Sequence, residues 1–247
     1  MSITEERIFA LEHNLICSRA NSEEILWANI FHDTIIGSRW FHNQPLSPGR
    51  AAIGYPALYA LYRVLDEFQP QNILEMGLGQ STKMISSYVK WRACQQAECR
   101  HVVVEHDQSW IDFFKKQNEV SDHTQIVRLD LIQASIETEK GDTTPVNLYK
   151  GFSEKFKNEK FDLIFIDGPF GSPLYSRIDI LDLLPECLAD SFVIMLDDAQ
   201  RTGEMNTIKM IIQAIVEGKC AVSAGYYSGQ KSTAVITSKD LHFLCRM

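Results

Sequence analysis

The stretch that decides the fold is Asn72–Thr82, which reads NILEMGLGQST. An apolar run containing Glu75 is followed by Gly77 and Gly79, and then by Ser81 at the start of a helical pattern. This order predicts a buried strand, a tight turn and a helix N-terminus, because glycine lets the backbone approach a ligand and the first helical N–H groups lack partners. We therefore expect a small polar ligand at this turn, with Ser81 as the helix N-cap.

Further apolar runs follow the same plan, and each of them ends near an acid. They cover 101–105, ending at Glu105, 125–131, near Asp130, 161–166, before Asp167, and 191–196, before Asp197 and Asp198. Two last runs, 220–227 and 232–237, are joined by a short turn without a helix, which predicts an antiparallel last strand. The sheet should then have about seven strands, mostly parallel.

Helical patterns separate these runs. They cover 57–68, 81–94, 109–119 with Trp110, Phe113 and Phe114 inward, 174–188, and 204–217. Strands that alternate with helices indicate an α/β protein with a doubly wound, Rossmann-like sheet. The stretch 132–160 is the least regular, and two readings remain open there: an insertion along the sheet edge, or an extra hairpin.

The first 50 residues are predicted to be a helical extension and a loop before a main domain at 51–247. Apolar residues at helical spacing predict two N-terminal helices within 3–36, with a break at Asn21–Ser22. The following loop, rich in Pro and Gly, contains Trp40, Phe41, His42 and Arg50. These side chains either line a ligand site or pin the extension to the core.

Composition narrows the classes of function. The formal net charge of −8 and the lack of a Lys/Arg run argue against a nucleic-acid partner. The six cysteines form no CxxC pair, which favours reduced thiols over a disulfide or zinc framework. The N-terminal residues do not resemble a secretory signal, and no apolar run is long enough for a membrane span. We expect a cytoplasmic protein with no membrane partner.

The acids at the strand ends select the ligand. In an open α/β sheet, ligands bind outside the carboxyl ends of the strands, so these acids should converge on one crevice. A dinucleotide usually needs the pattern GxGxxG, but the third glycine is missing here and Glu75 would lie close to the phosphates. A ligand with an ammonium group, a sulfonium and a bare ribose suits these acids better.

At this point the sequence resembles the class I S-adenosylmethionine-dependent methyltransferase family, over roughly residues 52–237. The resemblance makes the ExGxGxS stretch the first motif of the family, with Glu105 holding the ribose, Asp130 near the adenine and Asp167 beside the methyl group. The cofactor-binding residues that it implies are Glu75, Gly77, Gly79, Ser81, Glu105, His106, Asp130 and Asp167.

Within this class, FDLIFIDGP and VIMLDDAQRTGE are similar to small O-methyltransferases, namely catechol-type enzymes and bacterial relatives that modify sugars and other metabolites. Catechol-type members bind a divalent cation through an Asp and an Asp–Asn pair, which implies Asp167, Asp197 and Asp198 as ligands of Mg²⁺ or another divalent cation. Asp198 departs from the pattern, which has Asn there. With or without a metal, Asp167 and Asp197 are the candidate catalytic residues for activating a hydroxyl.

The expected function is therefore O-methylation of a small metabolite or saccharide. Arg177 and Arg201 either orient an anionic acceptor or pair with Asp179, Asp182 or Glu204. Two alternatives remain open: an inactive scaffold that binds S-adenosylmethionine, and a nicotinamide-dependent oxidoreductase. The sequence does not determine the oligomeric state, and a homodimer is one option.

Overall fold

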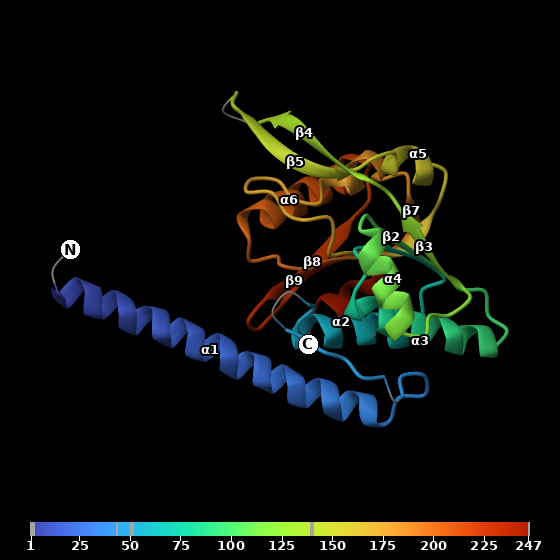
Figure 1. Ribbon diagram of the computed structural model, residues 1–247, viewed down its shortest axis with the longest axis horizontal. Helices are drawn as coiled ribbons and strands as arrows, with labels where there is room; N and C mark the ends of the chain where they lie inside the picture. Colours follow the sequence, from blue (N-terminus) through green and yellow to red (C-terminus); the bar gives the residue numbers. More distant parts are fainter. Residues whose placement is uncertain (1–2, 43, 50–51, 139–140, 247) are drawn as a thin grey trace.

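The computed structural model describes residues 3–42, 44–49, 52–138 and 141–246, and its centre is a seven-stranded sheet (Figure 1). The strands are β1 (Asn72–Met76), β2 (Arg100–Glu105), β3 (Thr124–Arg128), β6 (Phe161–Ile166), β7 (Leu188–Leu196), β8 (Val222–Ser228) and β9 (Ser232–Ser238). Their order is β3-β2-β1-β6-β7-β9-β8, and only β9 runs against its two neighbours. This confirms the predicted mostly parallel sheet and its antiparallel last strand.

Helices cover both faces of the sheet (Figure 1). One face carries α2 (Tyr55–Arg63) with its continuation η1 (Val64–Phe68), α3 (Gln80–Cys94) and α4 (Gln108–Gln117). The other carries α5 (Phe152–Phe156), the 3₁₀ turn η2 (Ile178–Leu183) and α6 (Thr202–Glu217). Successive residues of β1 serve the two cores in turn: Ile73 packs with α2 and α3, Leu74 packs with α6, and both are fully buried. The doubly wound architecture is thus confirmed.

The N-terminal extension is one helix, α1 (Ile3–Ile36), and the predicted break at Asn21–Ser22 is wrong. The Ser22 hydroxyl donates to the carbonyl of Ser18 at 2.9 Å, so the serine bonds within the helix instead of capping a new one. The second half of α1 packs on the domain through the buried rings of Trp27 and Phe31. The first half extends away from it (Figure 1), and Leu15 is 70% exposed.

The loop after α1 pins the extension to the core. Trp40 and Phe41 are buried, and the Trp40 indole donates to Asp66 at 2.9 Å. His42 is exposed, and Arg50 lies outside the described residues. The division at residue 50 stays a prediction. In the described ranges, no helix is both long and apolar enough to cross a membrane.

Two connecting segments bear on the predictions: at 132–160 one of the two alternatives is observed, and at 174–188 the prediction fails. The irregular stretch contains the hairpin of β4 (Leu131–Glu137) and β5 (Thr143–Tyr149), a separate antiparallel sheet that projects from the body (Figure 1). The predicted helix over 174–188 is wrong, since only η2 is helical there. Leu184 has extended backbone, because a residue before proline is driven out of the α region.

A last short helical segment, η3 (Lys239–Cys245), follows β9 and packs against β8 and β9.

Candidate functional site

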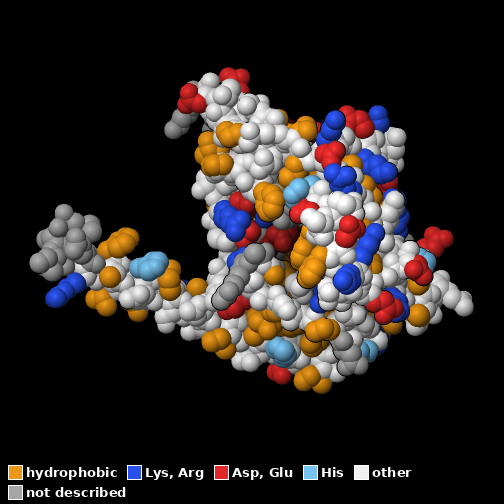
Figure 2. Space-filling model, in the orientation of Figure 1, with side chains coloured by type: hydrophobic (Ala, Val, Ile, Leu, Met, Phe, Trp, Pro, Cys, Tyr) orange, Lys and Arg blue, Asp and Glu red, His pale blue; other side chains and the backbone are white. Residues whose placement is uncertain are grey.

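A cavity of about 500 Å³ opens at the carboxyl ends of β1, β2, β6 and β7. The residues that define its chemistry are Gly77, Glu105, His106, Asp167, Arg177 and Asp198. Figure 2 shows this region as a hollow in the middle of the face, with acidic side chains on its floor. Three of the strand-end acids therefore share one crevice, as the rule for open α/β sheets predicts.

The glycine turn forms one wall of this cavity. Gly77 has φ +99°, and a Cβ there would lie 3.0 Å from the backbone nitrogen of Gly168, so the turns after β1 and β6 pack backbone on backbone. At Gly79 a Cβ would meet no atom within 4 Å. Gly79, rather than Ser81, is the N-cap of α3, and its N–H donates to the Thr82 hydroxyl at 3.0 Å. The predicted Ser81 cap is wrong.

Glu75 lies beneath the turn with no exposed surface. Ser81 Oγ donates to its Oε1 at 2.5 Å, and Nε2 of the buried His101 lies 3.0 Å from its Oε2. Both carboxylate oxygens therefore have protein partners, and the side chain does not line the cavity. This arrangement favours a role for Glu75 and Ser81 in fixing the turn, and their cofactor contact stays a prediction.

Glu105 ends β2 and faces the cavity with 6% of its surface exposed. Its Oε1 accepts the backbone N–H groups of His106 and Asp107 at 2.6 and 3.0 Å. Its Oε2 accepts the N–H of Leu78 at 3.2 Å, which ties β2 to the glycine turn. The His106 ring lies beside it, with Nδ1 2.7 Å from Oε1, and contacts Phe170 edge-on at 5.2 Å. Both residues line the cavity, and their cofactor contacts stay predictions.

Asp167 follows β6 and is the most accessible member of the acidic group, with 22% of its side chain exposed. Arg177 Nη2 lies 3.2 Å from its Oδ1. Burial raises the pKa of Asp167 to about 7, Arg177 acts to lower it, and Asp197 acts to raise it. Asp167 therefore has the geometry and the pKa of a group that exchanges a proton with a ligand in the cavity.

Asp197 has no exposed surface and does not line the cavity, so this geometry does not support its predicted catalytic role, which stays a prediction. Thr233 Oγ1 donates to its Oδ1 at 2.6 Å, and Lys231 Nζ lies 3.4 Å from its Oδ2. The last strand pair β8–β9 supplies both partners, because β9 pairs with β7 next to Asp197. Nothing in the sequence near Lys231 signals this contact.

The Asp198 carboxylate forms ion pairs with three side chains, Arg177 at 3.2 Å, Arg201 at 2.8 Å and Lys231 at 3.2 Å. Burial acts to raise its pKa, but these cations outweigh burial and leave the pKa below its ordinary value. Both arginines pair with acids, but within the described ranges their nearest partners are Asp167 and Asp198, not the predicted Asp179 or Asp182, and the alternative of an anionic acceptor stays a prediction. Glu204 lies 3.9 Å from both.

The carboxylates of Asp167, Asp197 and Asp198 place one oxygen each within 4.8 Å of one another, which is the composition of a divalent-cation site. Arg177 and Lys231, however, already lie between these oxygens. A divalent ion would have to share the same oxygens with two fixed positive charges. The residues present therefore do not fit a divalent cation.

Asp130 is not brought to the cavity lining as far as the described residues go. Its side chain is 64% exposed and pairs with Arg128 at 2.6 Å. The chain turns at this point into the β4–β5 hairpin, and the Asp130 carbonyl accepts the N–H of Lys150 at the base of that hairpin. The predicted role near an adenine is not supported by this geometry.

Aromatic side chains complete the cavity. Trp110 and Phe113, predicted to point inward, are 38% and 53% exposed, whereas Phe114 is buried as expected. Trp110 lines the cavity, and its indole donates to the Leu78 carbonyl at 2.8 Å. Tyr149 also lines it, and burial raises the pKa of this phenol well above its ordinary value, so it stays protonated. Trp110 follows the carboxyl end of β2 by about one helical turn, and this position in the sequence could have indicated that it lines the cavity.

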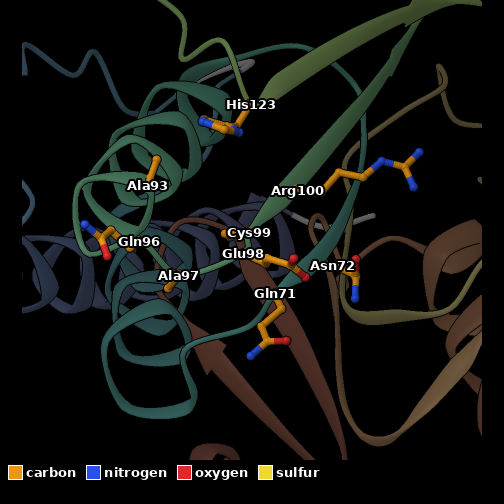
Figure 3. Close-up of a pocket in the computed structure, with 9 residues that line it drawn as sticks. All are labelled: Gln71, Asn72, Ala93, Gln96, Ala97, Glu98, Cys99, Arg100 and His123. Carbon is orange, nitrogen blue, oxygen red and sulfur yellow. The ribbon is translucent and has the colours of Figure 1, made fainter.

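A second hollow, drawn with its lining residues in Figure 3, lies at the amino ends of the strands, opposite the first cavity. It is formed by the amino ends of β1 and β2, the chain after α3 and the residue before β3, with Asn72, Gln96, Arg100 and His123 on its rim. It contains neither a strand-end acid nor a glycine turn. The cavity at the carboxyl ends is therefore the candidate functional site.

Comparisons with known proteins give distant structural matches. No family model matches the chain, and no curated protein matches it. The chain is similar in structure to a methyltransferase from Pyrococcus furiosus, with 17% identity, a TM-score of 0.45 and coverage of 86% of this chain and 96% of that one. It is also similar to the O-methyltransferase NovP, with 9% identity, a TM-score of 0.45 and coverage of 70% and 75%.

A third match is the spermidine synthase from Thermotoga maritima, with 13% identity and a TM-score of 0.42 over 69% of this chain. The chain spans about half the length of that protein, 54%. Methyltransferases are thus among the solved structures to which this chain is similar.

Proposed function

We propose that this protein is a methyltransferase that uses S-adenosylmethionine and methylates a hydroxyl group of a small metabolite or saccharide. The observation that carries the proposal is that Glu105 and Asp167, from the ends of β2 and β6, open on one cavity beside the Gly77 turn. The cavity volume, about 500 Å³, lies within the range of cofactor sites, which is roughly 300–1,000 Å³.

The cavity suits a cation better than a phosphate. Its lining contains the carboxylates of Glu105, Asp107, Asp167 and Asp198, while its two arginines are already paired with acids. A sulfonium and an ammonium group gain from such surroundings, whereas a pyrophosphate would be repelled by them. The open space at Gly79 leaves room for the methionine part of the ligand beside the start of α3.

Glu105 is the residue proposed to hold the ribose. Its Oε2 accepts only the Leu78 N–H among the described partners, so this oxygen keeps a lone pair for a ribose hydroxyl. The backbone N–H groups on Oε1 fix the orientation of the carboxylate before a ligand arrives. His106 and Trp110 form the adjoining wall.

Asp167 is proposed as the general base. S-adenosylmethionine supplies an activated methyl group, so the protein's contribution is to align the acceptor and remove its proton. A base is most effective when its pKa lies near the working pH, and burial brings Asp167 to about 7. The acceptor hydroxyl would approach from the open side of Asp167, opposite the fixed guanidinium of Arg177.

Calorimetric titration with S-adenosylmethionine and with its demethylated product tests the first part of the proposal. Saturable binding of both ligands is expected, and no binding to folded protein would refute it. Release of the demethylated product, measured over a set of sugars and phenols, then tests transfer. Tight binding without transfer to any acceptor would favour the inactive scaffold, and NADH binding seen by fluorescence would favour the oxidoreductase. The variant Asp167→Asn tests the general base. Asp122→Asn, the same substitution at an exposed position before β3, is its matched control.

A further inference from the structure

The acidic group at the ends of β6 and β7 has an unusual set of partners. Three carboxylates with oxygens within 4.8 Å of one another would ordinarily need a cation to offset their repulsion. In this protein the cations are side chains of the same chain, Arg177 from the start of η2 and Lys231 from the β8–β9 turn.

The two cations lie between the carboxylates. Arg177 Nη2 is 3.2 Å from Oδ1 of Asp167 and 3.2 Å from Oδ2 of Asp198, so one guanidinium nitrogen bridges two acids. Lys231 Nζ is 3.2 Å from Oδ1 of Asp198 and 3.4 Å from Oδ2 of Asp197. A metal ion bound at the usual distance of about 2.0–2.6 Å from these oxygens would lie next to both positive groups.

Neither cation is free to move away. The Arg177 side chain is 4% exposed, and its Nη1 also donates to the Asp197 carbonyl at 2.8 Å. Its backbone is left-handed, with φ +60°, and so is that of Asp198, its partner. Lys231 Nζ donates to the Ala52 carbonyl at 3.0 Å as well. Two non-glycine residues in a disfavoured backbone region, joined by an ion pair, indicate an arrangement that the fold enforces.

The formal charges of this acidic group and its cationic partners do not cancel. Four carboxylates, those of Asp167, Asp197, Asp198 and Glu204, carry four formal negative charges, and three side chains, Arg177, Arg201 and Lys231, carry three positive ones. Asp167 is the only one of the four whose side chain is more than a few per cent exposed, so the remaining negative charge faces the cavity there. A proton or a cationic ligand would neutralise it.

We propose that Arg177 and Lys231 replace the divalent cation at the Asp167–Asp197–Asp198 cluster, so that the protein binds no such cation there. The corollary, that methyl transfer needs no metal, rests on the proposed function. Exclusion of the cation does not rest on it, because it follows from the positions of the two side chains.

Titration of metal-free protein with Mn²⁺, followed by the electron paramagnetic resonance of the free ion, tests the proposal. We expect no binding by the wild type up to millimolar Mn²⁺. Binding with a micromolar Kd that disappears in Asp167→Asn would overturn the proposal. This experiment needs no methyl acceptor. A separate titration with S-adenosylmethionine tests the proposed function, so the two hypotheses can fail independently.

Lys231→Met provides the converse test. Removal of one internal cation should raise the Mn²⁺ affinity at least tenfold, while Lys209→Met, on the exposed face of α6, should leave it unchanged. Circular dichroism checks that each variant is folded. A folded Lys231→Met protein with the Mn²⁺ affinity of the wild type would overturn the role given to Lys231. If the variant does not fold, the wild-type titration alone decides.

Discussion

Two buried groups of polar side chains lie beneath neighbouring strand ends of this protein, and they differ in one respect. Glu75 and His101, under the end of β1, are both fully buried, and their contacts are completed within the protein. The Asp167 cluster, at the ends of β6 and β7, is equally rich in internal contacts, but Asp167 opens on a cavity. An acid at a strand end is therefore not a functional residue by position alone. What distinguishes the two groups is whether one oxygen remains accessible to a ligand.

Substitution of Asp167 by Asn should have the largest effect on activity. Loss of a general base typically lowers kcat about 10²- to 10⁴-fold, and the isosteric amide keeps the cavity shape. Steady-state kinetics should show this loss, while calorimetry shows cofactor affinity within a few-fold of the wild type. Activity within threefold of the wild type would remove Asp167 from the mechanism and break the contrast with Glu75.

Glu105→Ala should weaken cofactor binding. Hydrogen bonds to a charged group contribute about 1.5–3 kcal/mol, which corresponds to roughly a 10- to 150-fold rise in Kd. Isothermal calorimetry with S-adenosylmethionine measures the change. An unchanged Kd in the folded variant would show that the ligand does not use this carboxylate.

The activity should fall as the pH is lowered through about 7, by about tenfold per pH unit below the pKa of Asp167. Stability should change in the opposite direction. The folded-state pKa is raised above the value in the unfolded chain, so the folded protein holds the proton more tightly. The free energy of unfolding should therefore decrease as pH rises from about 4 to about 7, and Asp167→Asn should remove this dependence. Urea denaturation of both proteins at several pH values measures these free energies. The same pH dependence in the two proteins would contradict the prediction.

Glu75→Gln sharpens the comparison from its other side. The variant replaces one of two buried acceptor oxygens by an NH₂ group that cannot accept from Ser81 or His101, so we expect a loss of stability of about 1–3 kcal/mol. Cofactor affinity should stay within about threefold, since the side chain does not line the cavity. A large rise in Kd without a loss of stability would place Glu75 among the ligand contacts after all.

Deletion of residues 1–19 should have the smallest effect. The described side chains in this part of α1 are exposed, so the melting temperature should shift by about 1–2 °C. Sedimentation velocity of both forms also tests the homodimer considered from the sequence. Equal oligomeric states would show that this part of the helix does not carry a dimer contact.

The sequence predicted the parts of the fold that depend on local pattern. Apolar runs such as 161–166 are buried on both faces and could only be inner strands. Of the acids expected to converge on one crevice, Glu105, Asp167 and Asp198 line the cavity, whereas Glu75, Asp130 and Asp197 do not. Sequence could not show that Asp197 is closed off and Asp167 open, because the difference depends on Lys231 and Thr233, which belong to a distant strand pair.

Errors arose where tertiary contacts override local signals. Asn21 and Ser22 are typical of a helix break, but Ser22 bonds back to the preceding turn and Asn21 accepts from Gln230 in the β8–β9 turn, so α1 continues. Trp110 and Phe113 follow the spacing of a buried face, yet Trp110 lines the cavity and stacks at 5.6 Å on the exposed ring of Phe113. Large rings at a ligand site and large rings in a core have the same pattern in a sequence.

The contact between α1 and the β8–β9 turn constrains how this chain can diverge. Glu24 accepts the backbone N–H groups of Tyr55 and Gln230 at 2.8 and 3.0 Å, and a Cβ at Gly229 would lie 2.4 Å from its Oε2. A side chain at position 229 would therefore displace the Glu24 carboxylate from its bond to Gln230, and it would also crowd Pro56, whose Cγ lies 3.0 Å from the same Cβ position. Any substitution of Gly229 thus acts on the attachment of α1 as well as on the turn that carries Lys231.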